Sequence, residues 1–336
     1  MRKVRRILVG LICIALIVVA GAFAAAKYMT TVPGTPHSGA LPALTGEEAA
    51  LADRLKRHIE AIGSRPHNID HYDELQKAAN HIESVLTAAG YRIGRQPFMV
   101  DGTAVRNIDV IVAPTAGISA PQTIVVGAHY DSFDDAPGAN DNATGTAAVL
   151  ELAHLLKDLD GKAGKRIRLA LFVNEEPPYF QTRDMGSLHY ARALAEANEP
   201  VVAMYSLETL GFYSSEPGSQ HYPPPFGMIF GNKGDFVAFV AIRGSRELLD
   251  RTVASFRSHT AFPTVGGVAP GFIPGIDWSD HWSFMQHGFQ ALMITDTAYF
   301  RYPHYHKPTD TPDKIDTEKL ARVVKGIERV IRDAVK

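Results

Sequence analysis

Residues 123–157 have the sequence TIVVGAHYDSFDDAPGANDNATGTAAVLELAHLLK, in which an apolar run, a turn-rich segment and a helical pattern follow one another. The run Thr123–Ala128 is mostly apolar, as expected of a strand that is buried on both faces of a parallel sheet. The Pro-, Gly- and Asn-rich stretch after it favours a turn, and Thr144–Lys157 has apolar residues at helical spacing. Together they predict one unit of an α/β domain.

The same alternation continues along most of the chain. Further apolar runs of strand length occupy Ile108–Val112, Ile167–Val173, Val201–Leu207 and Ala291–Thr295. Helical patterns occupy Ala49–Ile62, Tyr72–Ala89, Gly186–Ala197, Glu247–Ser258 and Glu318–Val335. Strands interleaved with helices indicate a sheet that is covered on both faces. We therefore predict that residues 47–336 form an α/β domain of three layers, αβα, around a central, mostly parallel mixed sheet.

One segment, Ser214–Asp235, follows neither period and is predicted to be a long loop; it contains Pro223, Pro224 and Pro225. Loops of this length often form lids or substrate walls. Four aromatic residues in loops near the motifs described below are candidates for such a wall, although packing explains them equally well: Tyr222, Phe226, Tyr299 and Phe300.

The composition limits the classes of partner and metal ligand. The 336 residues carry a formal net charge of −2, with 46% hydrophobic and 21% charged residues, so the chain offers no basic face for nucleic acid. The single cysteine, Cys13, lies in the N-terminal apolar run, so the domain has no disulfide and no thiolate ligand. A metal would be held by histidine and carboxylate side chains, which suits zinc in a hydrolase.

The N-terminus predicts a membrane segment. The apolar stretch Ile7–Ala26 has about the length that spans a bilayer, and it follows the basic residues Arg2, Lys3, Arg5 and Arg6. Positive flanks stay in the cytoplasm, so residues 1–27 are expected to anchor the chain in the cytoplasmic membrane with the domain outside. Residues 28–46, rich in Pro, Gly, Ser and Thr, are expected to be a linker. Small residues near Ala26 leave an alternative, cleavage as a signal peptide and a secreted or periplasmic protein.

Metal-binding residue types stand where three of the predicted strands end. His129 ends one run, the adjacent acids Glu175 and Glu176 follow a second, and Glu208 follows a third. In open α/β sheets, ligands gather outside the carboxyl ends of the strands. Two adjacent acids at the end of an apolar strand are costly unless they are paired or bound to metal. Asp141, in the turn-rich segment, is a further candidate, with an N-terminal helix cap as the alternative.

Six short motifs stand in a fixed order along the chain: GAHYDS (127–132), GANDNATG (138–145), NEE (174–176), SLE (206–208), SDH (279–281) and YHKPTDT (305–311). Each motif is weak alone, but their order and spacing are specific together. The chain in this respect resembles the M28 family of zinc peptidases, which includes bacterial aminopeptidases and glutamate carboxypeptidase-like enzymes, over roughly residue 49 to the C-terminus.

The resemblance implies a site with two zinc ions and a general base. Glu175 would be the base that takes a proton from the nucleophilic water and returns it to the leaving amine. Asp141 would bridge the ions, and four further ligands would complete them: His129 and Glu208 for one ion, Glu176 and His306 for the other. Glu208 stands where many family members carry aspartate, and since glutamate is an equally good oxygen ligand, the departure bears on local geometry.

Three residues beside these ligands have more than one interpretation. Asp131 lies on the same side of its strand as His129 and is expected to orient that imidazole, with a surface carboxylate as the alternative. Resemblance to aminopeptidases implies that the Tyr305 hydroxyl stabilises the oxyanion of the tetrahedral intermediate, with an ordinary packed tyrosine as the alternative. His304 competes with His306 as a ligand, and the YHKPTDT match favours His306.

The SDH motif also has two interpretations. Resemblance to the family implies that Asp280 supports the pocket, whereas either Asp280 or His281 could instead cap a helix before Trp282 and Phe284, and no direct catalysis is assigned to them.

These motifs predict a zinc-dependent exopeptidase, most readily an aminopeptidase, that acts on peptides outside the cytoplasmic membrane. One alternative is a glutaminyl-peptide cyclotransferase, which shares the fold and typically works with one zinc, whereas His129 and Glu208 are both available here for a second. Another is a non-catalytic ectodomain, although such relatives usually lose metal ligands. The choice between amino- and carboxypeptidase, the substrate and the oligomeric state stay open.

Overall fold

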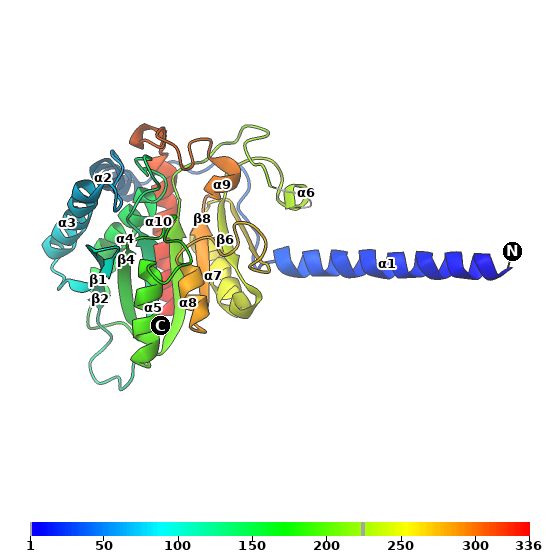
Figure 1. Ribbon diagram of the computed structural model, residues 1–336, viewed down its shortest axis with the longest axis horizontal. Helices are drawn as coiled ribbons and strands as arrows, with labels where there is room; N and C mark the ends of the chain where they lie inside the picture. The colour runs from blue at the N-terminus through cyan, green and yellow to red at the C-terminus, as the bar shows by residue number, and fades with distance from the viewer. Residues whose placement is uncertain (1, 223–225) are drawn as a thin grey trace.

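A mixed sheet of eight strands forms the centre of the molecule (Figure 1). The computed structural model describes residues 2–222 and 226–336, with side chains from residue 5 onward. The strand order is β1-β2-β4-β3-β5-β8-β6-β7. Strand pairs β3–β4, β3–β5, β5–β8 and β6–β7 are parallel, whereas β1–β2, β2–β4 and β6–β8 are antiparallel. The strands are β1 (Gly94–Val100), β2 (Thr103–Val112), β3 (Thr123–His129), β4 (Arg166–Phe172), β5 (Val201–Glu208), β6 (Val237–Ala241), β7 (Thr264–Val268) and β8 (Ala291–Thr295).

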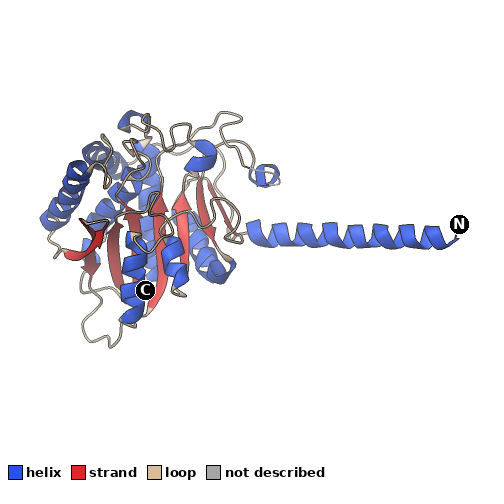
Figure 2. Cartoon of the chain, viewed as in Figure 1, coloured by secondary structure: helices blue, strands red, loops and turns tan. Residues whose placement is uncertain are grey.

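Helices cover both faces of this sheet (Figure 2). Because side chains alternate along a strand, Ile124 and Val126 of β3 face one layer and Val125 faces the other. The first layer contains α2 (Gly46–Ile62), α3 (Tyr72–Ala88), α4 (Ala143–Leu155), α7 (Arg246–His259) and α10 (Thr317–Ala334). The second contains α5 (Gly186–Glu196) and α8 (His281–Gln286). The predicted three-layer α/β fold is confirmed.

The predicted helices and strands are present, with small shifts at their ends. Helix α2 begins at a capping box, in which Thr45 Oγ1 accepts the N–H of Glu48 at 3.2 Å and the Glu48 carboxylate accepts the Thr45 N–H at 2.7 Å. Gly90, at φ +79°, ends α3, as left-handed backbone favours glycine. The prediction did not include strands β1, β6 and β7.

The segment Ser214–Asp235 is mostly loop, as predicted. Its two ends meet in a bridge between Ser214 and Gly234, and it contains the short helix α6 (Phe226–Phe230). The prolines Pro223, Pro224 and Pro225 lie outside the described residues.

The N-terminal helix α1 (Arg2–Thr30) projects away from the domain (Figure 1). Its part Arg5–Thr30 is long and apolar enough to cross a membrane, and a signal sequence has the same character. The predicted linker, residues 28–46, contacts the domain where it begins. Arg257 Nη1 donates to the carbonyls of Pro33 (2.7 Å) and Gly34 (2.8 Å), so the start of the linker is docked on α7.

One carboxylate joins the amino-terminal ends of β3 and β4. Glu199, in the turn before β5, accepts hydrogen bonds from Thr123 Oγ1 (2.6 Å), Arg166 Nη1 (2.6 Å) and Arg168 Nη2 (3.1 Å). Its side chain is 10% exposed. Burial raises the pKa of Glu199, but the hydrogen bonds from Arg168, Thr123 and Arg166 outweigh this effect and lower the pKa to about 2.

Replacing this carboxylate by Glu199→Gln is expected to lower the free energy of unfolding by about 2 kcal/mol at neutral pH, because two guanidinium groups lose their charged partner. A carboxyl with a lowered folded-state pKa stabilises the fold above its unfolded pKa of 4.5, and this contribution is lost as the pH falls toward about 2. Urea unfolding at several pH values measures the difference. The control Glu196→Gln makes the same change at an exposed position of α5, and a difference for Glu199→Gln that is independent of pH would contradict the charge as its source.

Candidate metal centre

The histidine and the acids predicted at strand ends meet at one edge of the sheet. Strands β4, β3 and β5 are parallel neighbours, so their carboxyl ends lie side by side. His129 is the last residue of β3, Glu208 is the last residue of β5, and Glu175 and Glu176 follow the end of β4. All four side chains are buried.

Asp141 and His306 reach the same point from two loops, and Asp141 faces two sets of ligand atoms. Its Oδ1 lies 3.3 Å from Nε2 of His129, which lies 3.4 Å from Oε2 of Glu208. Its Oδ2 lies 3.1 Å from Nε2 of His306, which lies 3.2 Å from Oε2 of Glu176. The five side chains thus form two groups that share Asp141, and the ligand atoms within each group lie within 4.8 Å of one another.

The loop before α4 leaves the Asp141 carboxylate free for this position. The helix cap is Asn142, whose Oδ1 accepts the N–H of Gly145 at 3.0 Å, so the cap alternative for Asp141 is wrong. Asp310 fixes the loop from the other side, because its carboxylate accepts the N–H groups of Asn140 (2.9 Å) and Asp141 (3.2 Å).

Asp131 contacts His129 through its backbone carbonyl, whereas the prediction relied on its side chain. The ring Nδ1 of His129 pairs with the backbone carbonyl of Asp131 at 3.1 Å, which leaves Nε2 for a metal, whereas the carboxylate is 3.6 Å from Nδ1. That carboxylate accepts the N–H groups of Glu175 and Glu176, both at 3.1 Å. Asp131 therefore orients the histidine with its main chain and holds the two adjacent acids with its side chain.

The SDH motif supports Glu208. Ser279 Oγ donates to Oε2 of Glu208 at 2.7 Å and pairs with Ser206 Oγ at 2.8 Å, a contact that the sequence did not predict. Asp280 precedes α8 at the cap position, but its side chain makes no cap hydrogen bond within the described chain and lies buried near the site. His281 pairs with the carbonyl of Ile276 at 2.8 Å, away from the ligand groups.

The His306 ring is held by stacking. Phe133 stacks on it with ring centroids 4.1 Å apart, and Tyr305 does so at 3.9 Å. The competing ring of His304 pairs instead with Thr309 Oγ1 at 2.9 Å. The geometry therefore brings His306, and not His304, to the acids.

Several carboxyl groups of the centre have raised pKa values. Burial raises the pKa of Glu176 to about 8 and that of Glu208 to about 7, and it raises the pKa of Glu175 well above its ordinary value. The neighbouring carboxylates add to each of these increases. Burial likewise raises the pKa of Asp280 to about 7. Several buried carboxylates this close together are costly to ionise unless positive charge lies beside them.

The two histidines and Asp141 instead favour their charged forms, since the histidine pKa values are raised and that of Asp141 is lowered. Burial alone lowers the pKa of His129, but the charges of Glu208 and Glu175 outweigh it and hold this pKa well above its ordinary value. Burial also lowers the pKa of His306, yet its contacts with the acids raise it to about 10. Burial raises the pKa of Asp141, while its contacts with the two histidines bring it below its ordinary value.

The donor set fits zinc. Nε2 of His129, Nε2 of His306 and Oε1 of Glu176 are buried and have no hydrogen-bond partner among the described residues. Buried polar atoms without a partner are costly, and these atoms lie in the groups that Asp141 joins. Imidazole nitrogen with carboxylate oxygen is the ligand chemistry of zinc in hydrolases.

A cavity of about 90 Å³ opens beside Glu208 and Tyr305. Its walls include the aromatic residues Tyr222, Trp278, Tyr299 and Phe300. Three of the four predicted wall residues therefore lie next to the site, and the fourth, Phe226, lines a neighbouring cavity. Tyr305 itself is half-buried, and the nearby carboxylates and burial hold its pKa well above the ordinary value, with burial as the larger cause.

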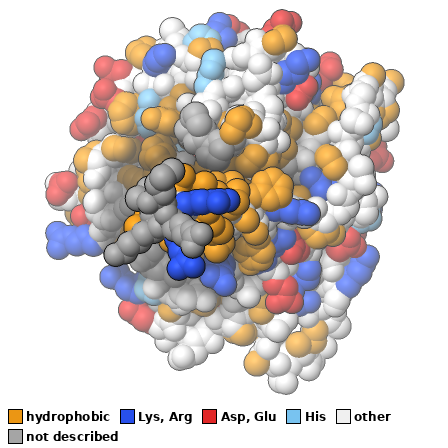
Figure 3. Space-filling view, turned by 90° about the vertical axis from the view of Figure 1, so that its right-hand side faces the viewer, with side chains coloured by type: hydrophobic (Ala, Val, Ile, Leu, Met, Phe, Trp, Pro, Cys, Tyr) orange, Lys and Arg blue, Asp and Glu red, His pale blue; other side chains and the backbone are white. Residues whose placement is uncertain are grey.

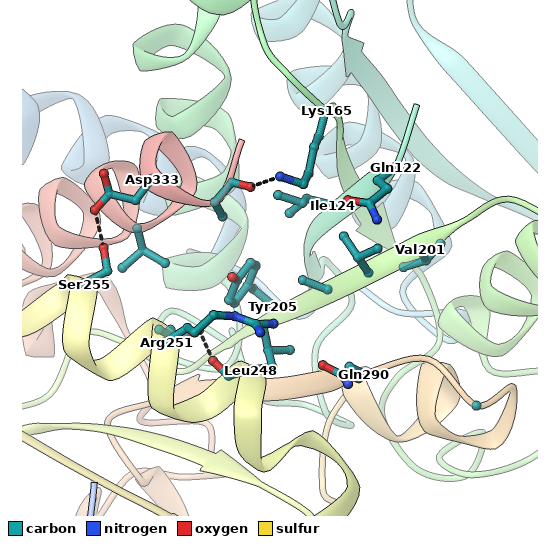
Figure 4. A pocket seen from close by; sticks show the side chains of 16 residues that line it. Gln122, Ile124, Lys165, Val201, Tyr205, Leu248, Arg251, Ser255, Gln290 and Asp333 are labelled. Atoms are coloured by element: carbon teal, nitrogen blue, oxygen red, sulfur yellow. Dashed lines mark hydrogen bonds between the residues drawn. The ribbon is translucent and has the colours of Figure 1, made fainter. Parts of the chain in front are cut away.

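A larger cavity, of about 730 Å³, lies near the amino-terminal ends of β3 and β5 (Figure 4). Lys165 Nζ donates there to the carbonyl of Ala334 at 2.9 Å, and Ser255 Oγ donates to Asp333 at 2.7 Å. The described residues that line it include no histidine and one acid, so this cavity lacks the donor set found at the carboxyl edge of the sheet.

Imidazole and carboxylate side chains gathered at the carboxyl edge of an αβα sheet are the arrangement expected of a metal-dependent hydrolase. The model of Peptidase family M28 matches residues 107–331, a range that contains every residue of the centre. The chain belongs to peptidase family M28 and is a metallopeptidase, which implies peptide substrates and a zinc-binding site.

Relatives agree with this assignment. The chain is 36% identical over 303 residues to the uncharacterized protein YfbL of Escherichia coli (strain K12), covering 87% of this chain and 90% of that protein. It is 28% identical over 220 residues to aminopeptidase YwaD of Bacillus subtilis (strain 168), covering 65% of this chain. That match spans only 42% of the Bacillus protein.

Solved structures share the fold. The aminopeptidase from Aneurinibacillus sp. strain AM-1 superposes with a TM-score of 0.67 at 18% identity, covering 85% of this chain and 94% of that one. The glutaminyl cyclase of Fimbriiglobus ruber superposes with a TM-score of 0.61 at 20% identity, covering 90% and 99%. At these identities the likeness is one of fold.

Proposed function

We propose that this chain is a zinc-dependent aminopeptidase that holds two zinc ions and uses Glu175 as its general base. The observation that carries the proposal is the position of Asp141, whose two carboxylate oxygens face separate ligand pairs. A carboxylate placed in this way can bridge two metal ions about 3.5–4 Å apart. The remaining ligands would be His129 and Glu208 for one ion, and Glu176 and His306 for the other.

Different residues around this centre would carry out different steps of the reaction. Bound zinc would polarise the scissile carbonyl and lower the pKa of the attacking water. Glu175 Oε2 lies 3.7 Å from His129 Nε2, so this carboxylate stands at the ligand groups and is positioned to take the proton of the water. Asp131 accepts the N–H groups of both Glu175 and Glu176, which fixes the main chain of these adjacent acids. The same Glu175 would then return the proton to the leaving amine.

The charge of the substrate pocket favours an amino-terminal substrate over a carboxyl-terminal one. Among the described residues that line the cavity beside Glu208, none is a lysine or an arginine. A carboxypeptidase needs a cation to pair with the terminal carboxylate of its substrate, whereas a free amino terminus pairs with an acid. Glu208 is the acid among the described residues that line this cavity, so the pocket carries a carboxylate and no cation.

The test is hydrolysis of matched peptides together with metal analysis of the purified chain. Peptides with a free amino terminus should be cleaved one residue at a time, acetylated versions should not, and the active chain should hold two zinc ions. Cleavage from the carboxyl end, or conversion of an N-terminal glutamine to pyroglutamate by a chain with one zinc, would contradict the proposal. The second result would instead support the glutaminyl-cyclase alternative, whose fold is shared.

The Tyr305 hydroxyl is proposed to donate to the developing oxyanion of the tetrahedral intermediate. Tyr305→Phe is then expected to lower kcat by about 10²-fold with little change in KM or zinc content, because the donor acts in the transition state. Steady-state kinetics measure this split. Tyr72→Phe removes a hydroxyl that bonds the Ala104 carbonyl and touches none of the proposed ligands, and equal kinetic losses in both variants would contradict the role.

We also propose that α1 remains attached as a membrane anchor, with residues 47–336 outside the cytoplasm and residues 28–46 linking the two. Its apolar length and the basic residues Arg5 and Arg6 before it support this orientation. Retention of the full-length chain in alkaline-washed membranes tests the anchor, and recovery of a shortened soluble chain would favour cleavage.

A further inference from the structure

The end of α1 is fixed to the domain. Arg246, the first residue of α7, donates to the carbonyls of Tyr28 and Thr31, the latter at 2.6 Å. Its guanidinium also lies over the Tyr28 ring, 5.0 Å from the centroid, and pairs with Asp250 at 2.8 Å. The direction in which α1 leaves the domain is therefore set by specific contacts.

Two glycines of β7 make this contact close. A Cβ atom on Gly267 would lie 2.7 Å from the carbonyl oxygen of Met29, which is closer than real Cβ atoms come. A Cβ on Gly266 would lie 3.2 Å from Cγ1 of Val32. Because these glycines have no side chain, the main chain at the end of α1 lies directly against β7. The last turn of α1 therefore packs on the sheet and is not joined to it by a flexible tether.

Apolar side chains project into solvent around the base of α1. Phe272 is 87% exposed and Met228 is 83% exposed, and Ile229 beside it is also exposed. They come from two segments that flank the helix, since α6 and the loop after β7 line one cavity together with Met29 and Thr30. Figure 1 places α6 on the side of the domain from which α1 leaves, and Figure 3 views this side, with apolar side chains gathered where α1 comes toward the viewer.

Basic residues lie on the same side. Lys27 is exposed on the last turns of α1, and the exposed Arg243 lines a surface hollow together with Ala25 and Tyr28. Exposed apolar side chains next to lysine and arginine are typical of a protein surface that lies on a bilayer. The apolar side chains enter the acyl region, and the cations contact anionic headgroups.

We propose that this side of the catalytic domain, the basal face, rests on the lipid bilayer that α1 enters. The basal face consists of Lys27, Met228, Ile229, Arg243 and Phe272. Met228 and Phe272 insert among the lipids, and Lys27 and Arg243 lie at the level of the phosphates. The occupant follows from continuity, because the membrane-length helix leaves the domain next to this face, where its end shares cavities with α6 and with Arg243. The proposal rests on α1 as an anchor and is independent of the peptidase reaction.

The test places a fluorescent label on the full-length chain in phospholipid vesicles. Cys13 is the only cysteine, so Cys13→Ala gives a background for Met228→Cys or Phe272→Cys, each labelled with an environment-sensitive dye. The matched control is Met99→Cys, a methionine that is 61% exposed on β1 at the other end of the sheet. Vesicles of phosphatidylcholine and phosphatidylglycerol carry a quencher on their acyl chains.

Labels at 228 and 272 are expected to shift to the blue and to lose at least about half of their emission to the lipid quencher, while the label at 99 keeps its emission. Equal quenching at the three positions, or a chain that does not enter vesicles, would overturn the proposal. A blue shift without lipid quenching would indicate burial against protein and would overturn it as well. A chain without peptidase activity would still report the bilayer contact, so the two proposals fail separately.

Discussion

Glu175→Gln is expected to lower kcat by about 10³-fold while the zinc content and the unfolding temperature stay close to those of the wild type. Glutamine keeps the shape of the side chain and its backbone N–H bond to Asp131, but it cannot accept the proton of the attacking water. Removing an acid whose pKa burial has raised should not weaken the fold. Steady-state kinetics, metal analysis and thermal unfolding of the same preparation measure the three quantities.

The control is Glu196→Gln, the same chemical change at an exposed position of α5, which should leave all three quantities unchanged. A Glu175→Gln variant with wild-type kcat would remove this residue as the base. A variant that loses zinc would place Glu175 among the ligands. The geometry also allows that role, because ligand atoms of Glu175, His129 and Glu176 lie within 4.8 Å of one another.

Asp141→Asn is expected to reduce bound zinc from two ions to at most one and to lower kcat/KM by about 10³-fold or more. The amide keeps one oxygen, so it can face His129 or His306 but cannot offer a carboxylate oxygen to both. Metal analysis after dialysis and peptide hydrolysis with added zinc measure the two effects.

A matched control for this change is Asp53→Asn on the exposed face of α2. If Asp141→Asn kept two zinc ions at wild-type affinity, the bridge would be wrong. Comparison of the two variants then separates the roles. Glu175→Gln is expected to keep its zinc without turnover, whereas Asp141→Asn is expected to lose zinc and turnover together.

The residues that end parallel strands were predictable from the sequence. An apolar run that stops at a histidine or an acid places that side chain at the carboxyl edge, and neighbouring strands share that edge whatever their order along the chain. His129, Glu176 and Glu208 could therefore be grouped from the sequence alone, and the motif after the last strand added His306. The structure brings these residues together, while their roles remain proposals.

Contacts that depend on tertiary packing were not predictable. Ser279 carries no sign in the sequence that it donates to Glu208, because the bond joins residues 71 positions apart. Phe133 lies in a turn-rich segment where nothing marks it as the stacking partner of His306. Asp131 was assigned to the correct neighbour, but a strand pattern does not distinguish a backbone carbonyl from a carboxylate as the partner of a ring nitrogen.

Three strands were missed for local reasons. Strand β1 contains Pro97 and charged or polar neighbours, which lower its strand propensity, and it lies at an end of the sheet where one side is unpaired. Strand β7 has Gly266 and Gly267 among five residues. Strand β6 is short enough to be confused with a helix segment by periodicity alone.

The glycines of β7 have a consequence beyond the direction of α1. Strand β7 is the last in the order, so its outer backbone would present free N–H and C=O groups on which a second molecule could add a strand. The segment around Met29–Val32 lies against that strand instead, fixed by Arg246 and Arg257. A second molecule that approached this edge would therefore also meet residues 29–32, which a cut after Ala26 would leave in place.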